Sequence, residues 1–117
     1  MSFLFACSSY GYAFCQTGNV YSDIACIKKE DNELRNKINS SYLKLEKLLK
    51  KEDKEELAKS HKAWIIYRDA QCKVLGVASE MSQGLGAELS QASCIFYFNK
   101  NRLDEINNTA KEIQDSR

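Results

Sequence analysis

An apolar residue recurs every three, four or seven positions along most of this sequence, and no proline interrupts the pattern. This spacing is typical of amphipathic helices, because residues three and four apart lie on the same helix face. Three such stretches are present, and glycine is concentrated in one short segment between the second and the third. We therefore expect an all-α fold, a three-helix antiparallel bundle around one core.

The spacing also predicts approximate helix boundaries. The first helix is expected over about residues 22–50, with an inward stripe of Ile24, Ile27, Leu34, Ile38, Tyr42, Leu45 and Leu49. A break is expected near 51–53, where Asp53 and Glu56 have the spacing of an N-cap and its capping-box partner. The second helix should end near Gly76, and its inner face comprises Leu57, His61, Trp64, Ile65, Arg68, Cys72 and Leu75. After a glycine-bearing loop over 76–88, the third helix begins between Ala87 and Ser90, with Leu89, Ala92, Phe96, Leu103, Ile106, Ala110 and Ile113 as its stripe.

Length and charge narrow the class of protein. The 117 residues fit one domain, which we expect over 14–117. The 17 Lys and Arg side chains nearly balance the 16 Asp and Glu side chains, so no strong overall field draws the chain to nucleic acid or to an anionic membrane. We expect a protein partner, no nucleic acid and no cofactor.

Five cysteines occur at wide spacings, at positions 7, 15, 26, 72 and 94. A zinc site would need close ligand pairs and histidines, whereas this chain has no CxxC and only His61. Disulfides are therefore the better interpretation, and they indicate a periplasmic or secreted protein. Leaving Cys7 aside, four cysteines allow three pairings. We favour Cys72–Cys94, which would close the 76–88 loop, and Cys15–Cys26, which would tie the entry segment to the first helix.

The amino terminus allows three interpretations. Residues 1–13 resemble a truncated signal peptide, because a short apolar run is followed by a small-x-small pattern ending at Ala13. Alternatively, residues 4–7 form a degenerate lipobox, and Cys7 then carries a lipid anchor. In the third interpretation this segment is an ordinary structured start, with Cys7 as a buried free thiol.

The sequence offers no convergent catalytic set, so we expect no enzymatic activity. His61 is the single imidazole, and a histidine at the partly buried edge of the core is the simplest account of it. Cys72 lies eleven residues further along the same helix, which is roughly 16 Å of rise and too far for a nucleophile and its base. Trp64 and Arg68 are four residues apart, so the guanidinium can stack on the indole while it reaches a carboxylate on a neighbouring helix. A partner surface that includes Trp64, Tyr67 and Arg68 is the functional alternative.

Residues 64–72, Trp-Ile-Ile-Tyr-Arg-Asp-Ala-Gln-Cys, resemble the central motif of the LprI-like lysozyme-inhibitor family of small bacterial envelope proteins. The likeness extends over about 15–106 and includes Tyr42 on the first helix, Gly84 and Gly86, the four cysteines and Arg102. It implies structural roles for Tyr42, Trp64, Tyr67, Arg68, Asp69 and Arg102. The chain departs from the family at Arg35, where the family often has an aspartate that could pair with Arg68 or Arg102, and at Ser60 and His61, which replace an Ala-Gln pair.

The resemblance implies an inhibitor of lysozyme or another peptidoglycan hydrolase, which would act by occluding the substrate groove. The glycine-bearing segment is the expected insertion element, with candidate partner-binding residues Glu80, Gly84, Leu85, Gly86 and Glu88. Two alternatives are an immunity protein against a cell-wall-degrading toxin and a scaffolding envelope protein. An exposed aromatic patch around Tyr97 and Phe98 would suit the scaffold.

Overall fold

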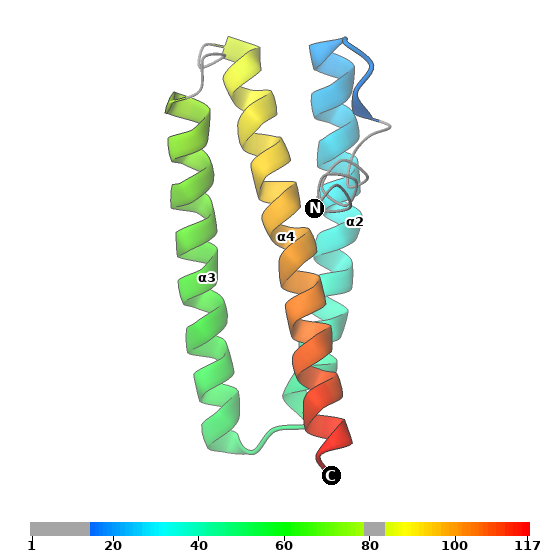
Figure 1. Ribbon diagram of the computed structural model, residues 1–117, viewed down its shortest axis with the longest axis vertical. Helices are drawn as coiled ribbons and strands as arrows, with labels where there is room; N and C mark the ends of the chain where they lie inside the picture. Colours follow the sequence, from blue (N-terminus) through cyan, green and yellow to red (C-terminus); the bar gives the residue numbers. More distant parts are fainter. Residues whose placement is uncertain (1–14, 79–83) are drawn as a thin grey trace, which may run out of the picture.

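The computed structural model describes residues 15–78 and 84–117, which form three long helices. They are α2 (Val20–Lys47), α3 (Lys51–Ala78) and α4 (Gly84–Asp115). Figure 1 shows α2 and α3 running in opposite directions, with α4 between them and antiparallel to α3, in a molecule measuring 48 × 27 × 27 Å. The expected all-α three-helix bundle is confirmed. None of the described helices is long and apolar enough to span a lipid bilayer.

The core lies mainly between α2 and α4, which pack against each other more extensively than α3 packs against α4. Its buried apolar side chains include Ile27, Leu34, Ile38, Leu45, Phe96 and Ile106, all of which belong to the predicted stripes. The predicted inner face of α3 is less covered, because this helix packs chiefly against α4 alone. Arg68, Cys72 and Gly76 are its buried residues, whereas Leu75, expected to face inward, is exposed. α4 is therefore the central element of the bundle.

The break between the first two helices lies three residues earlier than predicted. α2 ends at Lys47 and α3 begins at Lys51, where the Lys54 amide already donates to the Lys50 carbonyl over 2.9 Å. The prediction that Asp53 is the N-cap is therefore wrong. Asp53 lies instead inside the first turn with Glu52, where carboxylates interact favourably with the positive end of the helix dipole.

The connection between α3 and α4 is also shorter than the predicted loop. α3 continues past Gly76 to Ala78, and α4 begins at Gly84, so most of the 76–88 segment is helical. Gly84 has a φ of +58°, a left-handed conformation that suits glycine at the start of this helix. Gly76 is buried where α3 approaches α4, and a Cβ there would stand 3.4 Å from the Ala87 carbonyl oxygen. Gly76 thus lies in the contact between α3 and α4, and Gly84 begins α4.

Two disulfides, Cys15–Cys26 and Cys72–Cys94, are present, and both predicted pairings are confirmed. The first ties the segment before α2 to the second turn of that helix. The second joins α3 to α4, with a Cα–Cα distance of 5.5 Å. The predicted signal segment 1–13, the lipid-anchor candidate Cys7 and the candidate binding residue Glu80 lie outside the described residues.

Candidate functional site

The family-motif residues of α3 meet α4 around the indole of Trp64. The guanidinium carbons of Arg68 and Arg102 lie 5.0 Å and 5.3 Å from the centre of the Trp64 ring. These distances allow cation–π attraction, which strengthens when the cations are removed from water, and both arginines are buried. The predicted stacking of Arg68 on Trp64 is therefore confirmed, and Arg102 adds a second cation from α4.

A hydrogen-bonded relay crosses all three helices at this level. Arg68 Nη1 donates to Asn99 Oδ1 over 3.0 Å, and Asn99 Nδ2 donates to Asp31 Oδ1 over 2.7 Å. Asn99 is completely buried. Its side-chain amide accepts a hydrogen bond from a cation of α3 through its oxygen and donates one to a carboxylate of α2 through its nitrogen. The direct ionic partner of Arg68 is Asp69 of its own helix, 2.7 Å away. Arg68 was predicted to reach a carboxylate on a neighbouring helix, and it is linked to one, Asp31, only indirectly through Asn99.

The departure at Arg35 has a structural explanation. Arg35 pairs with Asp31, one turn earlier on α2, through Nε and Oδ2 at 2.8 Å. Asp31 therefore supplies the carboxylate of α2 at this level, and it bonds both Arg35 and Asn99. The relay consists of Asp31, Asn99 and Arg68, and we refer to it below as the interhelical relay.

His61 stacks beside Trp64, with ring centres 5.5 Å apart, and accepts hydrogen bonds from Arg102. Arg102 Nε and Nη2 stand 3.3 Å and 3.1 Å from His61 Nδ1. Since a guanidinium can only donate, Nδ1 must be unprotonated, and a neutral imidazole carries its proton on Nε2. Burial, followed by the charges of Arg102 and Arg68, lowers the pKa of His61 below its ordinary value. His61 is partly buried, between the rings of Tyr42 and Trp64, at the edge of the core as predicted.

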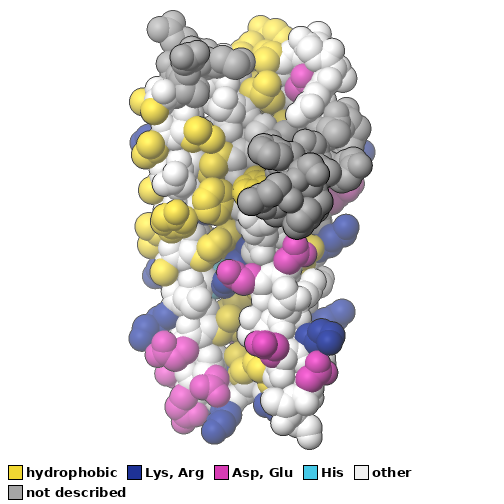
Figure 2. All heavy atoms as spheres, in the orientation of Figure 1, with side chains coloured by type: hydrophobic (Ala, Val, Ile, Leu, Met, Phe, Trp, Pro, Cys, Tyr) yellow, Lys and Arg dark blue, Asp and Glu magenta, His cyan; other side chains and the backbone are white. Residues whose placement is uncertain are grey.

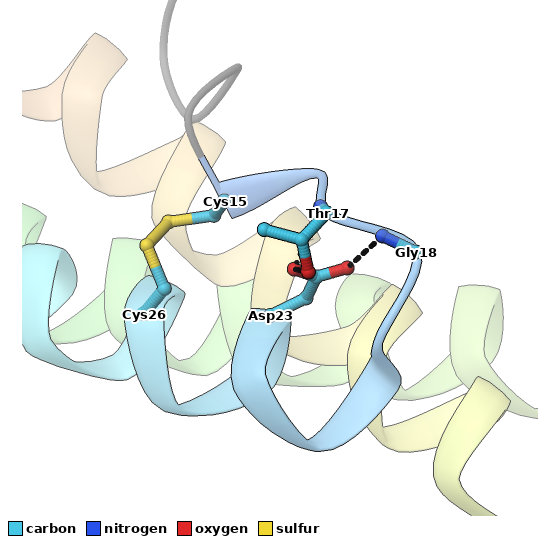
Figure 3. Close-up of a disulfide and its surroundings, with 5 residues drawn as sticks. All are labelled: Cys15, Thr17, Gly18, Asp23 and Cys26. Atoms are coloured by element: carbon cyan, nitrogen blue, oxygen red, sulfur yellow. Dashed lines mark hydrogen bonds between the residues drawn. A yellow bond between two sulfur atoms is a disulfide. The ribbon is translucent and has the colours of Figure 1, made fainter.

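A second polar cluster fixes the entry to α2 beside the Cys15–Cys26 disulfide (Figure 3). The Thr17 amide and hydroxyl donate to Asp23 Oδ1 over 2.9 Å and 2.7 Å, and the Gly18 amide donates to Oδ2. These bonds from Thr17 lower the pKa of the Asp23 carboxyl, because they stabilise its charged form. The Asn19 side chain caps the helix by accepting from the Ser22 amide. This cluster orders the start of the described chain.

The candidate partner-binding residues lie at the end of the bundle where α3 and α4 meet. Gly84, Leu85, Gly86 and Glu88 occupy the first turns of α4 and were expected in a loop or at a helix start. Glu88 Oε1 forms an ion pair with Lys28 Nζ of α2 at 3.0 Å, and both side chains are largely exposed. Glu88 and Lys28 also border a depression of about 300 Å³ between α2 and α4, with Asp31, Arg35, Gln91 and Ile95 in its wall. The structure therefore brings the α4 members of the set together on one helical end.

Several large apolar side chains are exposed along the outer face of α3. Ile66, Tyr67, Val74 and Val77 are 63%, 58%, 59% and 68% exposed, and Ala63 and Ala70 are exposed on the same face. We call these six residues the outer stripe. Figure 2 shows hydrophobic side chains gathered along this side of α3, whereas charged side chains crowd its first turns. Tyr67 also meets Phe98 of α4 edge-on at 5.8 Å. Of the two residues of the aromatic-patch hypothesis, Tyr97 is exposed and Phe98 is partly buried.

Sequence reasoning missed Asp31, Asn99 and the outer stripe. Asp31 and Asn99 are polar residues at buried positions of α2 and α4, and only a polar interruption of each apolar stripe could have signalled them. The outer stripe could have been found, since its members recur at helical spacing on the face opposite the predicted one. Within the described ranges no group of three or more His, Cys, Asp or Glu side chains could hold a metal ion.

Comparison with known proteins adds one finding. No curated protein and no solved structure matches the chain significantly. A family model described as "Lysozyme inhibitor LprI" matches residues 15–106, the extent over which the sequence resemblance was noted. This match spans all of α2 and α3, both disulfides and the interhelical relay. The chain belongs to the LprI lysozyme-inhibitor family.

Proposed function

We propose that this protein inhibits a lysozyme-type peptidoglycan hydrolase by binding to it, outside the cytoplasm in the bacterial envelope. Family membership over residues 15–106 is the observation that carries the proposal. Two disulfides support it, because such bonds persist in oxidising compartments such as the periplasm, where a hydrolase of this kind would be met.

In the proposed mechanism, the α3–α4 end of the bundle enters the substrate groove of the hydrolase and excludes the glycan. A two-helix end is narrow, and here it is held by the Cys72–Cys94 disulfide and by the close approach at Gly76. Such preorganisation favours binding, because little conformational freedom remains to be lost on association. Leu85 and Glu88 are the described side chains that would meet the groove first.

Charge would play a limited part in this recognition. The sequence has a formal net charge of +1, so it has no acidic field that could steer it towards a basic lysozyme. Affinity must then come from shape and apolar contact at the bundle end, with carboxylates such as Glu88 as local partners for cationic groove residues.

The test is a turbidity assay in which oxidised protein is added to c-type, g-type and i-type lysozymes acting on cell walls. A reduced and alkylated sample controls for the disulfides. The binding variant replaces Glu80, Leu85 and Glu88 together by alanine. Its matched control replaces Glu33, Leu43 and Glu55, which have the same side chains and are exposed elsewhere. We expect inhibition of one class that weakens at least about tenfold in the binding variant only.

Two results would contradict the proposal in different ways. Equal inhibition by the binding variant and its control would reject the bundle end while retaining the inhibitor function. Failure to inhibit any class would reject lysozyme as the target and favour the immunity-protein alternative, whose probe is a cell-wall-degrading toxin.

A further inference from the structure

We infer that the outer stripe of α3 pairs with the same stripe of a second copy, so that two chains associate through an antiparallel α3–α3 contact. This inference goes beyond the proposed inhibition and does not depend on it. It begins from the two-sided character of α3. One face carries Arg68, Cys72 and Gly76 against α4, and the other carries six exposed apolar residues.

The two faces of α3 point in nearly opposite directions. At about 100° per residue, the centre of the outer stripe lies roughly 180° around the helix from the buried face. A helix docked on the stripe therefore meets chiefly α3, and it reaches α4 only beside Tyr67, where Phe98 lies edge-on at 5.8 Å. Nothing in the described chain obstructs that approach, so α3 of another copy can lie along the whole stripe.

The stripe is symmetric about Ala70, which favours a second copy over an unrelated partner. Five of its six members follow one another at steps of three, four, four and three residues, through 63, 66, 70, 74 and 77, and the sixth, Tyr67, is opposite Lys73 of the other copy. In an antiparallel pair centred on Ala70, Ala63 faces Val77 of the other copy and Ile66 faces Val74. The two Ala70 residues thus meet at the crossing, where small side chains allow the helices to approach closely, and the small Ala63 lies opposite the larger Val77. Such self-complementarity is the condition for a twofold contact.

The flanking charges agree with the same arrangement. Asp69 and Lys73 lie on one border of the stripe, and in an antiparallel pair the same borders of the two helices adjoin. Asp69 of each copy then comes near Lys73 of the other, and these two attractions offset the approach of the two Asp69 carboxylates, each of which is also paired with Arg68 of its own helix. A parallel pair would place this border against the one carrying Gln71 and would lose both attractions.

The exposed area fits a weak but specific contact. At roughly 150 Å² for a fully exposed side chain of this size, the four larger members leave on the order of 400 Å² exposed on each chain. The two alanines and the aliphatic stems of Lys62 and Lys73 bring a pair to about 1,000 Å², the lower limit for a specific interface. We therefore expect a reversible dimer that forms at micromolar concentrations or above.

The first experiment measures the mass of the oxidised full chain by sedimentation between about 1 and 500 μM, the range in which so small an interface would associate. Ala70→Glu places two like charges at the centre of the contact and should raise the dissociation constant at least tenfold. Ala25→Glu, the same change at an exposed position of α2, should not. A wild-type chain that stays monomeric throughout this range would overturn the inference.

The second experiment tests orientation and needs no charged substitution. In a Cys7→Ser background, one sample carries Ala63→Cys and another carries Val77→Cys, and a short bismaleimide reagent links thiols that lie close together. The antiparallel register predicts faster linkage in the mixture than in either sample alone. Faster linkage of the Ala63→Cys sample with itself would overturn the antiparallel contact. If Ala70→Glu instead abolishes hydrolase inhibition while the wild type is monomeric, the stripe binds the hydrolase and the inference is wrong.

Discussion

Asn99 offers the sharpest test of how the bundle is held together. Its amide is fully buried and lies between the Arg68 guanidinium, at 3.0 Å, and the Asp31 carboxylate, at 2.7 Å. Asn99→Ala would remove both bonds and leave a cavity. Breaking a buried charged network usually costs about 3–5 kcal/mol. Here each charge keeps one ionic partner, Asp69 for Arg68 and Arg35 for Asp31, so we expect a loss of about 2–4 kcal/mol in the free energy of unfolding.

The assay is urea unfolding of the oxidised protein, with the loss taken from the shift of the midpoint at unchanged slope. Asn101→Ala is the matched control, because it makes the same substitution at an exposed site two residues away on α4. The gain in helix propensity from alanine then cancels between the two variants. A difference below about 1 kcal/mol between them would refute the idea that the interhelical relay holds α3 to α4. A double-mutant cycle with Asp31→Ala should show a coupling of about 1 kcal/mol or more, as contacting residues do.

Three further predictions follow from the same geometry. The folded chain holds the pKa of His61 below its ordinary value of 6.5. As pH falls, His61 is therefore protonated in the unfolded chain before it is protonated in the folded one. The free energy of unfolding should thus decrease below about pH 6.5 until the pH passes the pKa of His61 in the folded chain. His61→Gln should remove that part of the decrease in urea titrations between pH 7 and 5, and an unchanged slope would contradict the assignment. Replacing Cys72 and Cys94 by serine should lower the free energy of unfolding by about 3.4 kcal/mol, and replacing Cys15 and Cys26 should lower it by about 2.8 kcal/mol. The difference is expected because Cys72–Cys94 spans 22 residues and Cys15–Cys26 spans 11. The reverse order in urea unfolding would show that loop length does not decide the loss. Gly76→Ala should leave the free energy of unfolding unchanged or raise it by up to about 1 kcal/mol, because a Cβ there reaches only van der Waals contact. Gly76→Leu should lower the melting temperature, because the larger side chain would push α3 away from α4. Equal melting temperatures for the two variants would contradict this packing.

The fold was predictable because apolar periodicity reports directly on which helix face is buried. The stripes containing Ile27, Leu45 and Ile106 were predicted as buried, and these residues are among the least exposed in the described chain. Helix ends were less predictable. Lys51 to Glu56 are all compatible with a helix, so nothing in their side chains marks where the helix begins, and Asp53 looks like a cap although it lies inside the first turn.

The polar interior was harder to predict from a single sequence. Arg68 was expected to stack on Trp64 because both residues lie on one helix, four positions apart. Its partner Asn99 lies on α4, 31 residues further along the sequence, and Asp31 lies on α2, 68 residues before Asn99. Spacing along one helix carries no information about which polar side chains of different helices meet, so this part of the site required the packed structure.

The interhelical relay and the outer stripe are connected through the rotation of α3 about its axis. Because Arg68 must point at Asn99, and Cys72 four residues later must reach Cys94, the inner face of α3 is fixed at two successive turns. A helix rotated to bury Ile66 or Val74 would have to withdraw Arg68 from its acceptor and break the disulfide. The apolar stripe therefore stays in solvent because polar and covalent contacts on the opposite face hold it there. That arrangement is costly for a chain that remains alone, and it is accounted for if the stripe is covered on association.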